Sequence, residues 1–476
     1  MDDLTLLTDL YELTMLYGYH KNGMGGRRSV FTMFFRPASG LNYAVMAGNE
    51  QLKEYIENLR FSDKDLGYLD SLKLFDRAFL DSLRDFRFTG DIAIVREGSI
   101  VFPGEPIVRV DAPLSEAQFI ETAMLNLIGH QTLIATKANR IVRAAQGRAV
   151  AEFGARRAQS YDAAVLGARA SYIGGVASTS CVMAARDFGI PASGTMAHSW
   201  VQMFPSEYDA FRRYAELYPD NCVLLVDTYS VTRSGVPNAI RAFDDVLKPL
   251  GIRPRGVRID SGDIAYLSKR ARKMLDAAGY PDCTIVASNS LDEYIVRDLI
   301  LQDAKVDSFG IGENLITSKS EPVFGGVYKL AAVKDGETYI PKIKVSESVE
   351  KLTTPYPKEV WRIYDNETGK AMADYITIRG ESVETANGIT LFDPVETWKA
   401  RTFTGCSAKK LLVPVFAEGK KVYTSPSIEQ IRSFCAAQVA TLWDEVTRFE
   451  NPHRYYVDLS RRLWDERQRL LKEMSQ

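Results

Sequence analysis

Short polar runs follow a series of apolar, strand-like segments in the middle of the chain. These runs are Gly154–Arg157, Ala197–Ser199, Asp227–Ser230, Asp260–Asp263, Ser288–Ser290 and Gly310–Gly312. Together they supply arginine, histidine, hydroxyl and carboxylate side chains and a glycine turn. Guanidinium and backbone N–H groups bind phosphates, and carboxylates hold Mg²⁺ and ribose hydroxyls. The set therefore predicts a site for a phosphorylated sugar and a divalent metal.

Each run also has a simpler structural explanation when it is taken alone. The sequence of Asp260–Asp263 is typical of a turn and a helix N-cap. Adjacent arginines such as Arg156 and Arg157 usually form a solvated face, and glycines such as those of Gly310–Gly312 occur at many strand exits. A histidine such as His198 is more often structural than catalytic. A functional site explains all of these runs at once, whereas the structural reading needs a separate explanation for the run after each strand. We therefore favour the functional interpretation of the set.

The apolar segments alternate with amphipathic helical stretches. The expected strands are Ala149–Phe153, Pro191–Met196, Cys222–Asp227, Gly256–Asp260, Thr284–Ser288 and Val306–Ile311. The clearest helical stretches are Pro205–Leu217, Val236–Leu247, Asp263–Ala278 and Leu291–Leu301. This alternation predicts a parallel sheet with right-handed crossovers, and no GxGxxG follows the first strand. A β/α barrel is favoured, in which the carboxyl ends of all strands, and thus the polar runs, meet at one face.

The regions before and after the predicted barrel have a different pattern of expected helices and strands. Before the barrel we expect a helix over Leu4–Tyr19, a strand over Ser29–Arg36, short strands within Asp91–Asp111, and a long helix from Ser115 to about Gln146 that starts with a Ser115/Gln118 capping box. After about Pro341 we expect a hairpin over Trp361–Ile378 and a helical tail beyond Pro426. The prediction is an α/β protein with an N-terminal α+β domain (1–140), a β/α barrel (141–340) and a C-terminal module (341–476).

Composition limits the classes of partner. The 476 residues carry a formal net charge of −2, which gives no long-range attraction to nucleic acid. No segment has about 18 uninterrupted apolar residues, so no membrane span is expected. The start Met1-Asp2-Asp3 lacks the basic region of a secretory signal. The five cysteines form no CxxC pair, which argues against a disulfide framework or a zinc ribbon and favours buried thiols in the cytoplasm.

The chain resembles the nicotinate phosphoribosyltransferase family along most of its length. The matching motifs are Leu7–Tyr11, Phe34–Arg36, Gly98-Ser99, Phe102–Gly104, Leu133–Arg140, Gly154–Gln159, Gly194–Ser199 (GTMAHS), Asp227–Ser230, Arg233–Gly235, Val257–Asp263 (VRIDSGD), Gly310–Gly312 and Gly326–Leu330. The order GTMAHS and then VRIDSGD is highly specific. The resemblance implies a type II phosphoribosyltransferase with an incomplete β/α barrel, assembled as a homodimer.

The family's reaction and site residues follow from the same resemblance. Nicotinate and phosphoribosyl pyrophosphate would give nicotinate mononucleotide and pyrophosphate, with Mg²⁺ as cofactor and ATP as a co-substrate that transiently phosphorylates His198. Expected catalytic residues are His198, Asp227 and Asp260. Expected substrate-binding residues are Tyr11, Arg156, Thr195, Ser199, Arg258, Gly312 and Thr317. Lys137 and Arg140 are further candidates that would reach across a dimer interface.

Three positions depart from the family pattern. Glu313 stands where members often have threonine, and it adds a negative charge beside the presumed phosphate site. Ser288–Ser290 has serine where aspartate is common, and Thr354–Pro357 replaces a Pro-Gly turn. These departures concern the geometry of single loops.

Three other functions were weighed. The run Val223–Asp227 resembles the apolar-then-acidic signature of type I phosphoribosyltransferases, but only one acid follows, and Arg233–Gly235 replaces the expected Thr-Gly end. A nicotinamide phosphoribosyltransferase would share the fold and His198, and it is the closest alternative. A catalytically silent barrel acting as an assembly subunit is disfavoured by the intact His198, Arg156 and Asp260.

Overall fold

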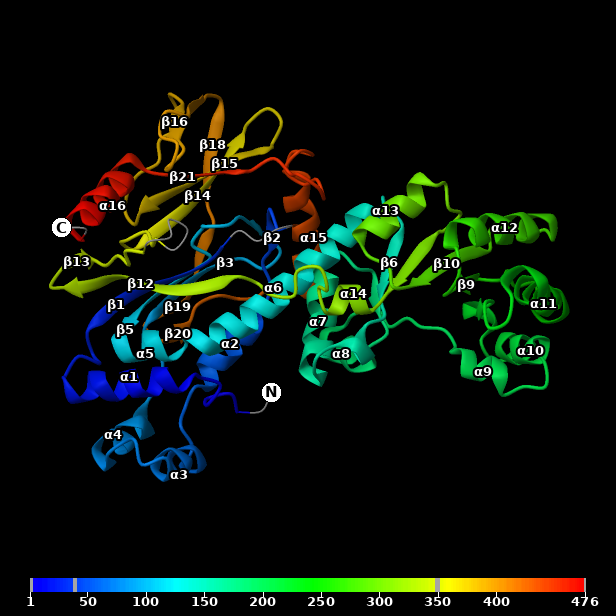
Figure 1. The fold of residues 1–476 in the computed structure, drawn as a ribbon, viewed down its shortest axis with the longest axis horizontal. Helices are drawn as coiled ribbons and strands as arrows, with labels where there is room; N and C mark the ends of the chain where they lie inside the picture. The colour runs from blue at the N-terminus through cyan, green and yellow to red at the C-terminus, as the bar shows by residue number, and fades with distance from the viewer. Residues whose placement is uncertain (1–2, 37–40, 347–351, 475–476) are drawn as a thin grey trace. The chain divides into compact units, whose positions relative to one another are not determined.

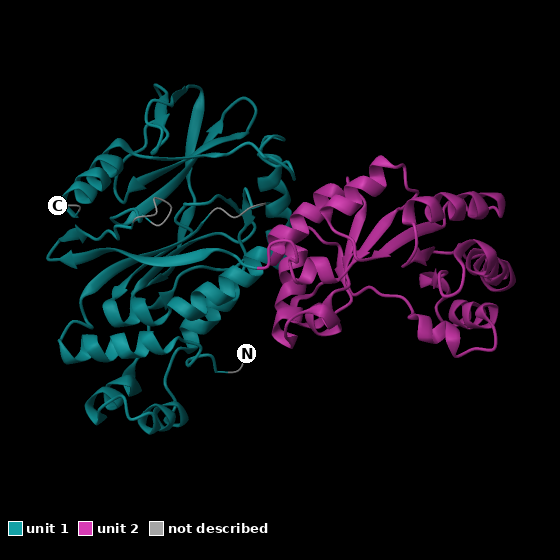
Figure 2. Ribbon diagram, viewed as in Figure 1, with its two compact units in different colours: residues 1–133, 323–476 teal, residues 134–322 magenta. Residues whose placement is uncertain are grey.

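The computed structural model describes residues 3–36, 41–346 and 352–474. The chain forms two compact units (Figure 2), and each is described by itself. Unit 1 combines residues 1–133 with residues 323–476, and unit 2 comprises residues 134–322. Residues from both ends of the sequence therefore fold together in unit 1. The predicted boundaries near 140 and 340 stay a prediction.

The main element of unit 1 is an antiparallel sheet of seven strands, in the order β13-β12-β1-β5-β3-β19-β20 (Figure 1). Its strands are β1 (Arg28–Phe35), β3 (Asp91–Val95), β5 (Val108–Pro113), β12 (Gly326–Asp335), β13 (Thr338–Pro341), β19 (Leu412–Ala417) and β20 (Lys420–Lys421). The strands expected over Ser29–Arg36 and within Asp91–Asp111 are confirmed, and β12 and β19 join them from distant sequence.

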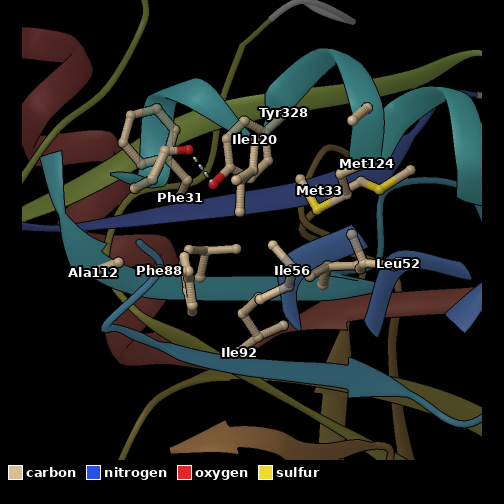
Figure 3. Packing of buried hydrophobic residues seen from close by; sticks show 14 of the residues in the cluster. Phe31, Met33, Leu52, Ile56, Phe88, Ile92, Ala112, Ile120, Met124 and Tyr328 are labelled. Atoms are coloured by element: carbon tan, nitrogen blue, oxygen red, sulfur yellow. Dashed lines mark hydrogen bonds between the residues drawn. The ribbon is translucent and has the colours of Figure 1, made fainter. Parts of the chain in front are cut away.

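Helices and a short ribbon complete the N-terminal part of unit 1. They are α1 (Leu10–Lys21), α2 (Asn49–Asn58), α3 (Asp63–Ser71), α4 (Arg77–Ser82), α5 (Leu114–Phe119), and the two-stranded ribbon of β2 (Ala44–Val45) and β4 (Ile100–Val101). The core between the sheet and these helices is apolar (Figure 3). Phe31 stacks on Tyr328 with ring centroids 4.9 Å apart, and the Tyr328 hydroxyl donates to the Ala117 carbonyl at 2.8 Å. The buried hydroxyl is thus satisfied inside the core.

The C-terminal part of unit 1 has a four-stranded sheet in the order β18-β14-β15-β21. Its elements are β14 (Lys358–Asp365), β15 (Ala371–Ile378), β18 (Cys406–Lys410), β21 (Tyr456–Leu459), the separate hairpin of β16 (Ile389–Phe392) and β17 (Ala400–Phe403), and the helices α15 (Ile428–Ala440) and α16 (Arg461–Met474). The β14–β15 pair confirms the hairpin expected over Trp361–Ile378. The tail beyond Pro426 contains the helices α15 and α16, which are separated by an irregular stretch over 441–455 and by β21.

The long helix expected from Ser115 is instead two helices. Helix α5 begins after Pro113, which caps it without a side-chain bond, and a second helix, α6 (Glu121–Ala144), follows Ile120. The predicted Ser115/Gln118 capping box is therefore wrong. At the break the backbone N–H of Thr122 donates to Glu12 Oε1 at 3.1 Å, so a carboxylate from α1 satisfies a free donor in the first turn of α6.

Unit 2 contains six parallel strands in the order β7-β6-β11-β10-β9-β8. They are β6 (Ala149–Glu152), β7 (Ser178–Thr179), β8 (Val223–Leu225), β9 (Gly256–Ile259), β10 (Thr284–Asn289) and β11 (Ser308–Ile311). Strands β7 and β8 are the two edges of the sheet, so the ladder is not closed into a full ring. The fold confirms the expectation of an α/β protein with an incomplete β/α barrel.

Helices connect the strands of unit 2. They are α7 (Tyr161–Ile173), α8 (Val182–Phe188), α9 (His198–Gln202), α10 (Glu207–Leu217), α11 (Val236–Ala242), α12 (Ile264–Ala277), α13 (Glu293–Leu301) and the single turn α14 (Glu313–Ile316). The four helices expected from periodicity are present, with the Val236–Leu247 stretch ending in a π-helical turn over Phe243–Leu247. No helix in the described ranges is long and apolar enough to cross a membrane.

The strand expected over Pro191–Met196 is wrong. Its only ladder contact is a single bridge between Ala192 and Thr179. Proline lacks the N–H that a central strand position donates, and the neighbouring strand β7 has only two residues to pair with. The segment instead crosses the carboxyl end of the sheet as an irregular loop that leads into α9.

Candidate active site

A pocket of about 490 Å³ lies at the carboxyl ends of the strands of unit 2. It is lined by Phe153, Ala155, Arg156, Arg157, Ser180, Gly194, Thr195, Met196, Ala197, His198, Arg258, Asp260, Ser288, Asn289, Ser290, Gly310, Gly312 and Glu313. These residues lie in or directly after the last residues of β6, β7, β9, β10 and β11, or in the loop before α9 and at its first residue, His198. This is the face at which barrel enzymes assemble their sites.

Arg258, on β9, is a fixed cation in the wall of this pocket. Its Nη2 donates to the Met196 carbonyl at 2.9 Å, and its buried Nε has no protein partner. Burial lowers the pKa of Arg258, the carboxylates of Asp260 and Asp227 oppose that shift, and Arg156 adds to it. The guanidinium group is therefore held in place on one side with a donor left for an anionic ligand.

His198 is the first residue of α9 and sits between two polar groups. Its Nδ1 lies 3.1 Å from Thr228 Oγ1, and its Nε2 lies 3.9 Å from Asp260 Oδ2. The imidazole is 40% exposed, so it remains accessible from the pocket. A tautomer with the proton on Nδ1 donates to Thr228 and leaves the lone pair of Nε2 free as a nucleophile.

Two aspartates are joined at the ends of β8 and β9. Asp227 Oδ2 accepts from the backbone N–H of Asp260 at 3.1 Å and from Ser261 Oγ at 2.6 Å. Asp260 Oδ1 in turn accepts from the Ser288 hydroxyl. The other oxygen of Asp227, Oδ1, is buried and has no protein partner. An orphaned carboxylate oxygen beside an anion pocket is suited to a metal ion.

A buried carboxylate lies beneath the pocket. Glu152, the last residue of β6, is fully buried, and its two oxygens accept from the Gly154 N–H and from Thr179 Oγ1, the latter at 2.7 Å. Burial raises its pKa, and these two hydrogen bonds oppose the shift. A Cβ on Gly154 would lie 2.7 Å from the Gly312 carbonyl oxygen, so only glycine permits this close approach of the two loops.

The loop after β11 forms the rim of the pocket. Glu313 Oε1 lies 2.9 Å from Lys319 Nζ, and Glu313 Oε2 lies 3.9 Å from Arg157 Nε. The hydrogen bond from Lys319, together with its charge and that of Arg157, lowers the pKa of Glu313. The Thr317 hydroxyl turns back onto its own helix and donates to the Glu313 carbonyl at 2.7 Å.

The structure brings together most of the site residues that the sequence predicted. Arg156, Thr195, His198, Arg258, Asp260 and Gly312 line the pocket, and Asp227 is bonded to Asp260 beside it. Ser199 and Thr317 are not among the lining residues, although each neighbours one or lies on the rim helix. Tyr11 is an exposed residue of α1 in unit 1.

Lys137 and Arg140 bind within unit 2. Both are buried on α6, and Glu293 accepts from Lys137 Nζ at 2.5 Å and from Arg140 Nε at 2.9 Å. These contacts show a role for both cations inside the unit.

Sequence reasoning did not select Phe153, Ser180 or Thr228. Phe153 is the last residue of the predicted strand Ala149–Phe153, whereas β6 ends at Glu152. Ser180 follows β7, a strand of two residues that carries no periodic signal. Thr228 lies in the polar run Asp227–Ser230, from which only Asp227 is predicted as a site residue.

The described residues contain no cluster of three or more His, Cys, Asp or Glu that could hold a metal ion by themselves. Mg²⁺ does not need such a cluster, because it is commonly bound through one or two carboxylates together with substrate phosphates and water. Asp227, through its orphaned Oδ1, and Asp260 are the residues that would supply those carboxylates.

A barrel-like parallel sheet whose strand ends gather arginines, a histidine and aspartates is typical of an enzyme that acts on a phosphate-bearing substrate. Sequence comparison agrees along nearly the whole chain. Profiles of the nicotinate phosphoribosyltransferase N-terminal domain, the nicotinate phosphoribosyltransferase family and its C-terminal domain match residues 6–129, 149–342 and 357–467. The chain belongs to the nicotinate phosphoribosyltransferase family.

Individual relatives show how far the similarity extends. A nicotinate phosphoribosyltransferase from Bacillus subtilis is 44% identical over 476 residues, which cover 99% of this chain and 96% of the relative. The human nicotinate phosphoribosyltransferase is 32% identical over 96% of this chain and 95% of its own length. The crystal structure of human nicotinic acid phosphoribosyltransferase superposes with a TM-score of 0.84 at 29% identity, covering 99% of this chain and all of that one.

Proposed function

We propose that this protein transfers the phosphoribosyl group of phosphoribosyl pyrophosphate to the ring nitrogen of nicotinate, forming nicotinate mononucleotide and pyrophosphate in NAD biosynthesis in the cytoplasm. The observation that carries the proposal is the pocket of unit 2, where Arg258 keeps a free buried donor beside Arg156, His198 and Asp260. Membership of the family and 44% identity to the Bacillus subtilis enzyme support it.

The displacement needs charge stabilisation more than base catalysis. The nitrogen lone pair of nicotinate attacks the anomeric carbon, the bond from that carbon to the pyrophosphate oxygen breaks, and the electron pair leaves with pyrophosphate. Positive charge grows on the sugar and negative charge on the leaving group. Arg156 is positioned at the pocket to stabilise the leaving pyrophosphate, and no proton has to be removed from the attacking nitrogen.

Arg258 is assigned to the carboxylate of nicotinate. Its guanidinium group is anchored by the Met196 carbonyl and retains an unpaired Nε. A carboxylate can accept a charge-assisted hydrogen bond from this group, whereas the neutral amide of nicotinamide offers a weaker acceptor. Thr195, which precedes Met196, lines the same part of the pocket and is assigned to the same substrate.

Mg²⁺ is part of the proposal. Asp227 and Asp260 would hold the ion, with Asp227 Oδ1 as the orphaned oxygen available to it. When bound, the ion would neutralise charge on the pyrophosphate. The protein's own contribution is to fix both carboxylates, through Ser261 on Asp227 and Ser288 on Asp260.

ATP coupling is assigned to His198. Attack of an imidazole nitrogen on the γ-phosphorus of ATP would form a P–N bond, break the bond to the β-bridging oxygen and release ADP. Later transfer of the phosphate to water restores the histidine. The half-exposed ring, held between Thr228 and Asp260, supports this role because a neutral imidazole keeps one free nitrogen lone pair.

A homodimer completes the proposal. Large apolar side chains of unit 2 are exposed at Val182 (75%), Met203 (82%) and Tyr229 (63%). Exposed apolar side chains of this size are candidates for a contact with a second subunit. A partner subunit would cover them, and its α1 would bring Tyr11 to the nicotinate.

A substrate panel tests the function. The purified protein with Mg²⁺, phosphoribosyl pyrophosphate and ATP is supplied with nicotinate, nicotinamide or quinolinate, and products are separated by chromatography. Formation of nicotinate mononucleotide with equimolar pyrophosphate supports the proposal. Preferential consumption of nicotinamide or quinolinate, or of none of the three, would refute it.

A further inference from the structure

We propose that Glu313 acts as an internal competitor for the substrate's phosphate groups: its carboxylate binds two cations at the rim of the pocket and thereby weakens the binding, and speeds the release, of pyrophosphate. This inference rests on the proposed function, since it concerns the same pocket. It assigns a role to a residue that has none in the transfer reaction itself.

The contacts of Glu313 carry the inference. One carboxylate oxygen lies 2.9 Å from Lys319 Nζ, and the other lies 3.9 Å from Arg157 Nε. Glu313 and Arg157 both line the pocket. Each of the three charged side chains is at least 40% exposed, so a soluble anion can reach the same cations. The carboxylate thus pairs with two cations, Arg157 and Lys319, that a phosphate oxygen in the pocket could otherwise attract.

The backbone that carries Glu313 is held at the rim. The next residue, Asn314, is 9% exposed, and its Nδ2 donates to the carbonyl oxygens of Ser290 at 3.0 Å and Leu291 at 3.2 Å. The Thr317 hydroxyl caps the Glu313 carbonyl from the other end of the turn. Glu313 therefore cannot leave the rim without breaking these bonds, and its charge stays beside the pocket whether or not a ligand is bound.

The charges at the pocket indicate that Glu313 lowers the affinity for a polyphosphate. The cations that line the pocket, Arg156, Arg157 and Arg258, attract a polyphosphate, and a fixed carboxylate among them reduces that attraction. A bound phosphate must displace the Glu313 carboxylate from Arg157 and Lys319 before it can interact with the full positive charge of these two side chains. The lowered pKa of Glu313, caused by Lys319 and then Arg157, keeps this carboxylate ionised at neutral pH. The same repulsion favours departure of pyrophosphate after the reaction.

The experiment is a titration with inorganic pyrophosphate, without metal and in EDTA, followed by calorimetry on the full-length protein. Glu313→Gln should bind pyrophosphate about two- to fivefold more tightly than the wild-type protein, the size of effect that exposed charge pairs produce. The gain should shrink at 1 M salt, where such charges are screened. Glu216→Gln is the matched control, because Glu216 pairs with Arg212 and Arg213 on α10, away from the pocket lining.

Steady-state kinetics give a second readout. In Glu313→Gln the KM for phosphoribosyl pyrophosphate should fall by a similar factor, and the KM for nicotinate should stay unchanged. Unchanged or weaker pyrophosphate binding by Glu313→Gln would overturn the inference, and weaker binding would make Glu313 a ligand of the substrate. A wild-type protein that neither binds pyrophosphate nor forms nicotinate mononucleotide would instead refute the proposed function.

Discussion

Thr228 Oγ1 lies 3.1 Å from Nδ1 of His198, on the side of the ring opposite the nitrogen that faces Asp260. The hydroxyl belongs to the residue directly after Asp227, so the loop that carries the presumed metal carboxylate also orients the imidazole. A hydroxyl that accepts the Nδ1 proton fixes both the tautomer and the rotation of the ring. Thr228 is thus a positioning residue for His198.

Replacement of His198 separates ATP hydrolysis from phosphoribosyl transfer. His198→Ala should abolish ATP hydrolysis stimulated by nicotinate, because it removes the imidazole that is proposed to accept the phosphate, while some uncoupled transfer remains. Thr228→Val keeps the imidazole but removes its partner, and it should lower coupled ATP hydrolysis without abolishing it. Labelled ATP and acid-labile phosphoprotein report the coupling. Full ATP coupling in His198→Ala would show that the phosphate is carried elsewhere.

Replacement of Arg258 tests how the pocket reads the carboxylate of nicotinate. Arg258→Gln keeps much of the length and removes the charge, so the KM for nicotinate should rise by about 10- to 150-fold, the equivalent of a charge-assisted hydrogen bond of about 1.5–3 kcal/mol. The KM for nicotinamide should change less, and the melting temperature should change little. Arg255→Gln, exposed just before β9, is the matched control. An equal rise in the KM for both substrates would mean that Arg258 does not bind the carboxylate of nicotinate.

Most of the parallel sheet was predictable because its strands are short apolar runs between clear amphipathic helices. The errors occur where long-range partners decide the structure. The break before α6 depends on Glu12, a side chain 110 residues away that bonds the Thr122 N–H. The missing strand at Pro191–Met196 depends on β7, whose two residues leave one bridge for Ala192. Neither partner is visible in the local sequence.

The candidate site was predictable as a set of strand ends but not as a network of contacts. Position at or directly after a strand end brings Arg156, Arg258 and Asp260 to one pocket, whereas His198 reaches it from a loop that was expected to be a strand. The hydrogen bond between His198 and Thr228 could not be predicted, since it requires the loop conformations. Polarity alone also could not place Thr317, whose hydroxyl bonds the Glu313 carbonyl.

Replacement of Glu152 tests whether its buried hydrogen bonds position the loops that line the pocket. Its two oxygens bind the Gly154 N–H and the Thr179 hydroxyl, and these donors begin the segments that carry Arg156 and Ser180. Glu152→Leu leaves both donors unpaired, so it should destabilise the protein by about 1–3 kcal/mol and raise the KM for phosphoribosyl pyrophosphate. Glu152→Gln can still accept from Gly154 and donate to Thr179, so it should be nearly neutral. Urea unfolding and initial rates measure both effects, and an unchanged KM in Glu152→Leu would contradict a positioning role.

Assembly can be tested by complementation. If Tyr11 of one subunit completes the pocket of the other, Tyr11→Ala and Arg156→Ala should each be nearly inactive alone. Mixing them under conditions that allow subunit exchange should restore partial activity, because one site of each mixed dimer then has both wild-type residues. Sedimentation equilibrium gives the subunit number in the same buffer. A fully active monomer, or no recovery on mixing despite exchange, would contradict a shared site.

The buried carboxylate of Glu12 makes the stability of unit 1 depend on pH. Burial raises its pKa from 4.5 to about 7, the hydroxyls of Thr122 and Thr8 oppose the shift, and Glu121 adds to it. The folded protein therefore binds a proton at Glu12 that the unfolded chain has lost between these pH values. The stabilisation is fully present below pH 4.5 and disappears as the pH rises through about 7, by at most about 1.4 kcal/mol per pH unit.

Glu12→Gln should remove this dependence, because the amide has no proton to lose in this range and can still accept from the Thr122 N–H. The difference in stability between the variant and the wild-type protein should be smallest at pH 5, and the variant should become progressively more stable than the wild-type protein as the pH rises to 8. Urea midpoints of both proteins between pH 5 and 8.5 provide the measurement. Glu57→Gln serves as the control, since Glu57 is an exposed residue of α2 that pairs with Lys421 at the surface. If the difference between Glu12→Gln and the wild-type protein stays constant with pH, Glu12 does not titrate in this window.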